Sequence, residues 1–180
     1  MVDKKEGLQP KVIDKQEVVN RLRLANEDLR ETISRIDSRD LERTQVTDEG
    51  WTVKDVLSHL AAWNTQYLIE INGILRNDAS WQKFYEDKAG EDEFNRLAVE
   101  ERKAKPFSQV FDEWSSSINR VIERVEALSL AEWIYQSGSD VWSDGSPITV
   151  YSLFNYSYNN KPHEAGHAQA IRERLGLDKN

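Results

Sequence analysis

The sequence of 180 residues contains no cysteine, which excludes disulfide bonds, thiolate nucleophiles and cysteine-ligated metal sites. A chain without cysteine fits a reducing compartment, so we expect a cytoplasmic protein. The sequence also lacks an apolar run long enough to cross a bilayer. Its first twelve residues carry positive charge but no apolar core, which is not the pattern of a signal peptide. We therefore expect no membrane partner.

Basic residues are in the minority, because 24 Lys and Arg stand against 32 Asp and Glu and give a formal net charge of −8. They are dispersed among the acidic residues and do not form the concentrated basic face that phosphate binding needs. Dispersed charge of this kind is typical of solvated helix faces. We therefore expect no nucleic-acid partner.

Strand-like alternation is nearly absent, and apolar residues instead recur at spacings of three and four. This pattern predicts amphipathic helices at residues 14–36, 52–75, 107–128 and 149–175. Four helices joined by long connections favour an all-α fold, a four-helix bundle.

The rest of the chain is expected to connect these helices. Residues 1–12 are predicted to be a flexible lead-in, and residues 13–180 a single domain. Residues 81–105 are either a long connection or an irregular helix. Residues 129–132 form a capping box that predicts a short extra turn, and residues 135–147 look like a loop because Gly and Pro interrupt them.

Histidine is scarce, with three in the chain, and two of them are four residues apart. His163 and His167 enclose Glu164 in the pattern H-E-x-x-H. Four residues of an α-helix advance about 6 Å and turn roughly 40° past a full turn, so both rings project from one face and can chelate one ion. His59 lies on the flank of the second predicted helix, beside its apolar stripe. All three rings are able to meet at one end of the bundle.

Two other interpretations of the histidines stay open from the residues alone. A lone histidine such as His59 is more often a residue at the edge of a core than a ligand. The H-E-x-x-H pattern also occurs in zinc peptidases, but these need a third ligand further along the chain. The extended form of that motif requires Gly and His where this chain has Ala170 and Glu173. We therefore regard the peptidase match as accidental.

Pro162 directly precedes His163 and cannot donate a hydrogen bond to the carbonyl of Tyr158. The last helix therefore either kinks at this point or restarts here, with Asn160 as its cap and Pro162 in its first turn.

Two segments, GWTVKDVLSHLAAW at residues 50–63 and HEAGHAQAIRERLG at residues 163–176, resemble the signature segments of the DinB/YfiT-like superfamily. That superfamily includes the mycothiol-dependent maleylpyruvate isomerase N-terminal domain and the bacillithiol transferases. The resemblance implies a four-helix bundle in which His59, His163 and His167 bind one metal ion. The segment LFNYSYNNKPHEAGH also resembles the ClbS/DfsB branch, whose members act on electrophilic toxins and do not always keep the metal histidines.

Three neutral imidazoles leave the charge of a divalent ion uncompensated, which makes the ion a strong Lewis acid. Zinc or nickel suits such a site, and iron, cobalt and manganese are compatible with it. The ion lowers the pKa of a bound water toward about 7, as a hydrolase requires. The resemblance implies instead a thiol S-transferase, whose sulfur must come from a low-molecular-weight thiol cosubstrate because the chain has no cysteine. We expect an enzyme of detoxification that acts on a small-molecule substrate.

Other residues near the histidines are candidates for supporting roles. Glu164 is the nearest candidate for a general base, although it can equally face a neighbouring helix. Asp55 and Glu70 are either hydrogen-bond partners of the histidine on the second helix or ordinary surface carboxylates. Trp63 and Tyr156 either wall a substrate pocket or belong to the core.

Two functions without catalysis compete with this interpretation. The chain is a candidate for a binding protein that sequesters a toxic small molecule, as in the ClbS/DfsB branch. It is equally a candidate for a structural partner that uses a helix face for association. A homodimer is the default assembly for such a bundle.

Overall fold

The computed structural model describes residues 12–78, 80, 88–142, 145–156 and 161–178. The predicted lead-in falls outside these ranges except for Val12, so its flexibility stays a prediction. The described elements, in chain order, are α1 (Lys15–Ser34), α2 (Val53–Arg76), α3 (Lys88–Arg102), α4 (Phe107–Ala127), α5 (Leu130–Trp133), β1 (Gln136–Val141), β2 (Pro147–Thr149), α6 (Val150–Tyr156) and α7 (His163–Leu175).

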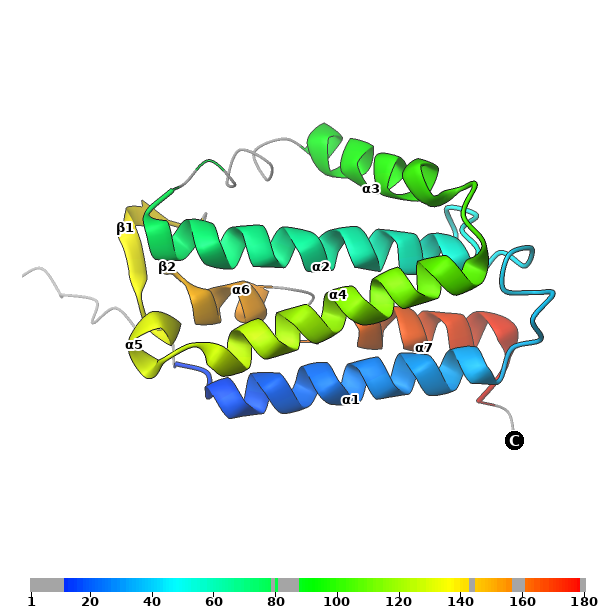
Figure 1. The fold of residues 1–180 in the computed structure, drawn as a ribbon, viewed down its shortest axis with the longest axis horizontal. Coiled ribbons are helices and arrows are strands. Elements are labelled where there is room, and N and C mark those ends of the chain that lie inside the picture. Colours follow the sequence, from blue (N-terminus) through cyan, green and yellow to red (C-terminus); the bar gives the residue numbers. More distant parts are fainter. Residues whose placement is uncertain (1–11, 79, 81–87, 143–144, 157–160, 179–180) are drawn as a thin grey trace, which may run out of the picture.

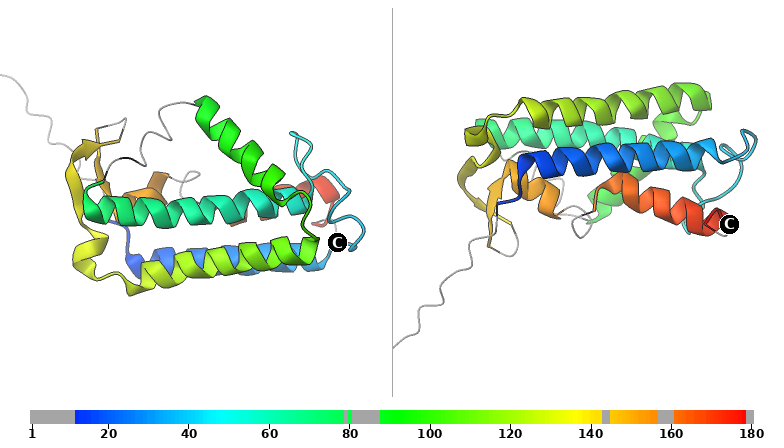
Figure 2. Two further views of the ribbon diagram at one scale, coloured as in Figure 1. Left: turned by 45° about the horizontal axis from the view of Figure 1, so that its top comes forward. Right: turned by 90° about the horizontal axis from the view of Figure 1, so that it is seen from below.

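Four helical units run side by side and form a bundle (Figure 1). These units are α1, α2, α4 and the pair α6 and α7, which together occupy the place of a single fourth helix. Helix α2 packs against α4, α1 packs against α4 and α7, and α2 also contacts α6 and α7. Helix α3 packs on the outer side of α2 (Figure 2). The predicted four-helix bundle is confirmed.

The start of α2 is defined by the predicted capping box. The Thr52 hydroxyl accepts a hydrogen bond from the backbone N–H of Asp55 at 3.3 Å, and the Asp55 carboxylate accepts one from the backbone N–H of Thr52 at 2.9 Å. Two backbone donors that the first helical turn leaves unpaired are thereby satisfied. This cap defines the first residue of α2, the helix that carries His59.

The apolar stripes predicted from the sequence meet along the axis of the bundle. Because each stripe follows the helical period, one face of each helix is buried and the opposite face stays in solvent. The largest fully buried apolar side chains of this core are those of Trp114, Trp133, Leu29, Leu57, Leu60, Ile71, Ile74, Ile118, Leu128, Ile148 and Ile171.

The last predicted helix, at residues 149–175, is split into α6 and α7, which agrees with the alternative that it restarts at Pro162 and not with a kinked continuous helix. Helix α7 restarts at His163, and Pro162 occupies its N-cap position with ψ 145° and no side-chain cap. Proline lacks an N–H and is tolerated only where no helical bond is lost, which explains why the helix begins after it. The expected cap, Asn160, lies outside the described residues. Gly176 ends α7 in the left-handed conformation at φ 66°, as predicted.

Two connections have more structure than the sequence indicated. Residues 88–102 form α3, which agrees with the irregular-helix alternative. The expected loop at residues 135–147 is wrong, because Gln136–Val141 pairs with Pro147–Thr149 as an antiparallel hairpin. The two strands hold too many polar residues to show the alternation of apolar and polar residues that predicts a strand. Burial of Ser137 and Ile148 against the bundle stabilises the hairpin instead.

None of the helices in the described part of the chain combines the length and the apolar character that spanning a bilayer requires.

Replacement of Thr52 by Ala removes one half of the capping box. We expect the free energy of unfolding to fall by about 1 kcal/mol, because the N–H of Asp55 then lacks its acceptor. Denaturant unfolding of Thr52→Ala beside Thr52→Ser checks this. The serine variant keeps the hydroxyl and serves as the matched control. Equal stability of wild type and Thr52→Ala would contradict the assigned cap.

Candidate metal centre

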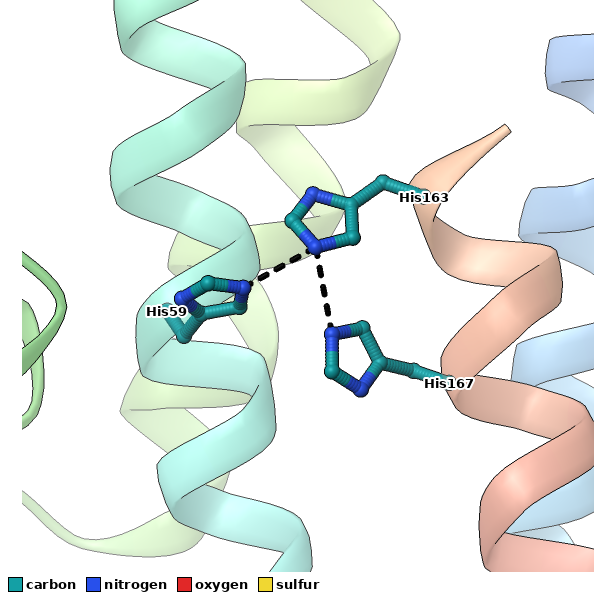
Figure 3. A group of neighbouring side chains, drawn as sticks. All are labelled: His59, His163 and His167. Carbon is teal, nitrogen blue, oxygen red and sulfur yellow. Dashed lines mark hydrogen bonds between the residues drawn. The ribbon is translucent and has the colours of Figure 1, made fainter. Parts of the chain in front are cut away.

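The three histidines converge on one point between α2 and α7 (Figure 3). Nε2 of His59 lies 2.9 Å from Nε2 of His163, and Nε2 of His167 lies 3.2 Å from the same atom. One ligand nitrogen from each ring lies within 4.8 Å of the other two. The expected meeting of rings from distant parts of the chain is therefore present.

The convergence of three Nε2 atoms fits a cation better than it fits hydrogen bonding. An Nε2 atom of a neutral ring carries either one hydrogen or one lone pair, so that of His163 can satisfy only one of its two neighbours. A cation accepts all three lone pairs at once. Four-coordinate Zn²⁺ with zinc–nitrogen bonds of about 2.0–2.1 Å holds its ligand nitrogens about 3.3 Å apart. The two Nε2 distances to His163 approach this value.

Burial keeps the three imidazoles neutral. His59 and His163 are buried, and His167 is half-buried. Burial, reinforced by repulsion from His167, lowers the pKa of His59 to about 3, and burial lowers the pKa of His167 to about 4. The pKa of His163 also falls well below its ordinary value because of burial and of its two neighbours. Rings of this kind offer lone pairs at neutral pH, as metal ligation requires.

Aromatic side chains enclose the cluster on the side of α2 and α3. The ring centroid of Trp51 lies 5.1 Å from that of His59, and Trp63 lies 6.2 Å from His59 and 6.1 Å from His163. Trp63 donates through Nε1 to Oδ1 of Asn95 on α3 at 2.9 Å. The same amide opposes the fall in the pKa of His59, although Nδ1 of His59 makes no well-formed hydrogen bond. These contacts cover His59 and His163, each of which is 4% exposed.

A groove of about 530 Å³ lies beside His167, which is the member of the cluster that lines it. One wall is the loop 46–49, and the other is α7, from His167 to Arg174. Glu49 lies near enough to oppose the fall in the pKa of His167. The groove falls within the volume range of small-molecule sites.

A second cavity lies where Pro162, His163 and Glu164 face Asn64 and Tyr67 of α2. Its volume of about 30 Å³ is room for only one or two water molecules. The groove beside His167, and not this cavity, therefore has the size to admit a substrate.

Glu164, the predicted general base, is 2% exposed and faces the interior of the bundle. Its Oε1 accepts a hydrogen bond from Nδ2 of Asn64 at 3.1 Å. Burial raises the pKa of Glu164, against the opposing effect of its own backbone N–H, of Asn64 and of Trp114. This geometry agrees with the alternative that Glu164 faces a neighbouring helix, here α2. A catalytic role of Glu164 stays a prediction.

The other predicted residues take different places. Trp63 lies against the histidines, whereas the side chain of Tyr156 is not among the described ones. Asp55 caps α2. Glu70 accepts a hydrogen bond from Gln66 at 3.1 Å and is 1% exposed, so it is not a surface carboxylate. No described hydrogen bond joins either carboxylate to His59.

Sequence reasoning missed Asn64, Asn95 and Trp114 as neighbours of the site. Asn64 carried a usable signal, because it is a polar residue within the otherwise apolar stripe of α2, and buried polar groups require a partner. Asn95 and Trp114 carried none, since only the packing of α3 and α4 brings them close.

Comparison with solved structures shows the same fold elsewhere. An uncharacterized protein from Clostridium difficile 630 is similar with a TM-score of 0.66 and 13% identity, over 92% of this chain and 97% of that one. YfiT from Bacillus subtilis, described as a probable metal-dependent hydrolase with an unusual four-helix bundle topology, is similar with a TM-score of 0.59 and 16% identity, over 97% and 94% of the two chains. At these identities the likeness establishes the fold. No curated protein sequence matches the chain.

The sequence also matches a protein family. Residues 22–147 fit the model of the family described as the mycothiol maleylpyruvate isomerase N-terminal domain. His59 lies within the matched range, and His163 and His167 follow it. Since the match covers more than half of the chain, this protein belongs to the mycothiol maleylpyruvate isomerase N-terminal domain family, within the DinB-like superfamily.

Proposed function

We propose that this protein is a metal-dependent enzyme that acts on a small molecule and that His59, His163 and His167 are the protein ligands of one divalent ion. The observation that carries the proposal is the convergence of three Nε2 atoms from α2 and α7. Membership of the DinB-like superfamily and the likeness to YfiT support it. Zinc or nickel suits an all-imidazole donor set, and iron, cobalt and manganese are alternatives.

A divalent ion held by three neutral imidazoles supplies Lewis acidity that lowers the pKa of a bound water or thiol. The protein contributes the surroundings of that chemistry. Trp51 and Trp63 cover part of the cluster, and the groove beside His167 has room for a substrate. A low local dielectric strengthens every charge interaction in such a site.

Two reactions fit this arrangement. A hydrolase uses water as the nucleophile, and a thiol S-transferase uses a low-molecular-weight thiol. The chain has no cysteine, so the sulfur of a transferase comes from a cosubstrate. The family is described by a mycothiol isomerase, which supports the use of a thiol cosubstrate, and the description of YfiT supports the hydrolase.

Metal analysis tests the ligand set. We expect wild-type protein, purified without a metal-affinity tag, to bind about one ion per chain and His59→Ala, His163→Ala and His167→Ala to lose it equally. Gln169→Ala, an exposed residue on α7, is the matched control and keeps the ion. Elemental mass spectrometry gives the stoichiometry. Wild type that binds no ion, and whose melting temperature does not rise when Zn²⁺ or Ni²⁺ is added, refutes the proposal.

Turnover separates the two reactions. Metal-loaded protein is assayed with activated esters alone and with an electrophile plus a small thiol. We expect one of the two assays to show turnover that falls to the metal-free rate in His59→Ala, since that change removes a ligand. Tight binding of an electrophile without turnover, unchanged in His59→Ala, would identify a sequestering protein instead.

A further inference from the structure

A buried chain of hydrogen bonds joins three helices of the bundle directly beside the metal centre. Nδ2 of Asn64 on α2 donates to Oε1 of Glu164 on α7 at 3.1 Å and lies 3.2 Å from Oγ of Ser117 on α4. The Ser117 hydroxyl donates to the backbone oxygen of Trp114 at 2.7 Å. The Trp114 indole N–H lies near the Glu164 carboxyl without completing a hydrogen bond of good geometry.

These groups lie in the core. Asn64 and Glu164 are each 2% exposed, and Ser117 and Trp114 are also buried. A buried polar group that loses its partner carries the full cost of its desolvation, so the bundle is most stable when the two helices keep the amide and the carboxyl at bonding distance. The link between Asn64 and Glu164 therefore restrains the separation of α2 and α7.

This restraint acts at the level of the imidazoles. Glu164 directly follows His163, and Asn64 follows His59 by five residues, which is about 7.5 Å along a helix. The first turn of α7 has no side-chain cap, because Pro162 holds the cap position. The bond from Asn64 to Glu164 anchors that turn to α2 beside the contact between the imidazoles of His59 and His163.

We infer that Asn64 and Glu164 are positioning residues of the metal centre, because their hydrogen bond sets the separation of α2 and α7 where the imidazoles converge. This inference rests on the proposed metal site and assigns Glu164 a role other than general base. The Glu164 carboxyl faces the interior of the bundle and accepts a hydrogen bond from Asn64. It therefore affects the metal site by fixing the position of His163, the residue before it. Groups that orient metal ligands typically change metal affinity 10–100-fold when they are removed.

Four variants test the link. Asn64→Leu removes the donor, and Glu164→Met removes the acceptor while leaving Asn64 bonded to Ser117, so the two break the same bond at different cost to folding. The paired change Asn64→Asp with Glu164→Gln exchanges donor and acceptor and restores the bond. Ser117→Ala is the matched control, because it weakens the network on α4 and leaves the link between α2 and α7 in place.

The probe is Co²⁺ added to metal-free protein, with affinity measured by titration and ligand geometry read from the visible absorption spectrum. We expect Asn64→Leu and Glu164→Met to weaken Co²⁺ binding by about 10-fold or more and to change the spectrum. The exchanged pair recovers most of the affinity and the wild-type spectrum. Ser117→Ala binds Co²⁺ like wild type even though the melting temperature of its metal-free form falls.

Two results overturn the inference while leaving the metal site intact. In the first, Asn64→Leu and Glu164→Met both bind Co²⁺ with the affinity and spectrum of wild type and differ only in a lower melting temperature. The link would then be purely structural. The other is failure of the exchanged pair to recover affinity although it folds. Wild type that binds no Co²⁺ would instead refute the proposed site itself, so the two failures are distinguishable.

Discussion

The site depends on the close approach of three neutral imidazoles, two of them buried and the third half-buried. The distances between their Nε2 atoms suit a shared cation. Hydrogen bonds alone cannot satisfy all three atoms, because Nε2 of His163 can pair with only one of its two neighbours. Burial lowers the pKa of all three rings, so their neutral forms prevail at physiological pH. The surrounding helices must hold this arrangement, and much of the bundle serves to do so.

Helix α7 contributes most to this arrangement, because it supplies two of the three rings. Pro162 ends any continuous helix and makes His163 the first helical residue. Toward its other end α7 is tied to α1, where Arg172 donates to Asp28 at 2.6 Å and to Thr32 at 2.9 Å. At its start it meets α2 through Glu164 and Asn64. The restart thus gives α7 a placement independent of α6, which a continuous helix would not allow.

The surroundings of the cluster suit a reaction centre. Trp51 and Trp63 pack against His59, Asn95 of α3 holds Trp63, and a groove borders His167. Many proteins share a bundle of this kind, so the fold does not name a reaction. What distinguishes a member is the set of side chains that lines the groove. In this protein, the groove combines the acidic residues Asp48, Glu49 and Glu173 with Arg174.

The sequence by itself determined the helices with strong apolar periodicity, the caps at Thr52 and Ser129, and the three histidines, because each of these depends on residues close together in the chain. Periodicity also indicated which faces are buried. Only the tertiary structure decided between a kink and a restart before His163, added a polar hairpin at one end, and showed that Glu164 faces Asn64 and not the imidazoles. The physical reason is that these outcomes depend on contacts between distant segments, whose energies no local pattern of residues contains.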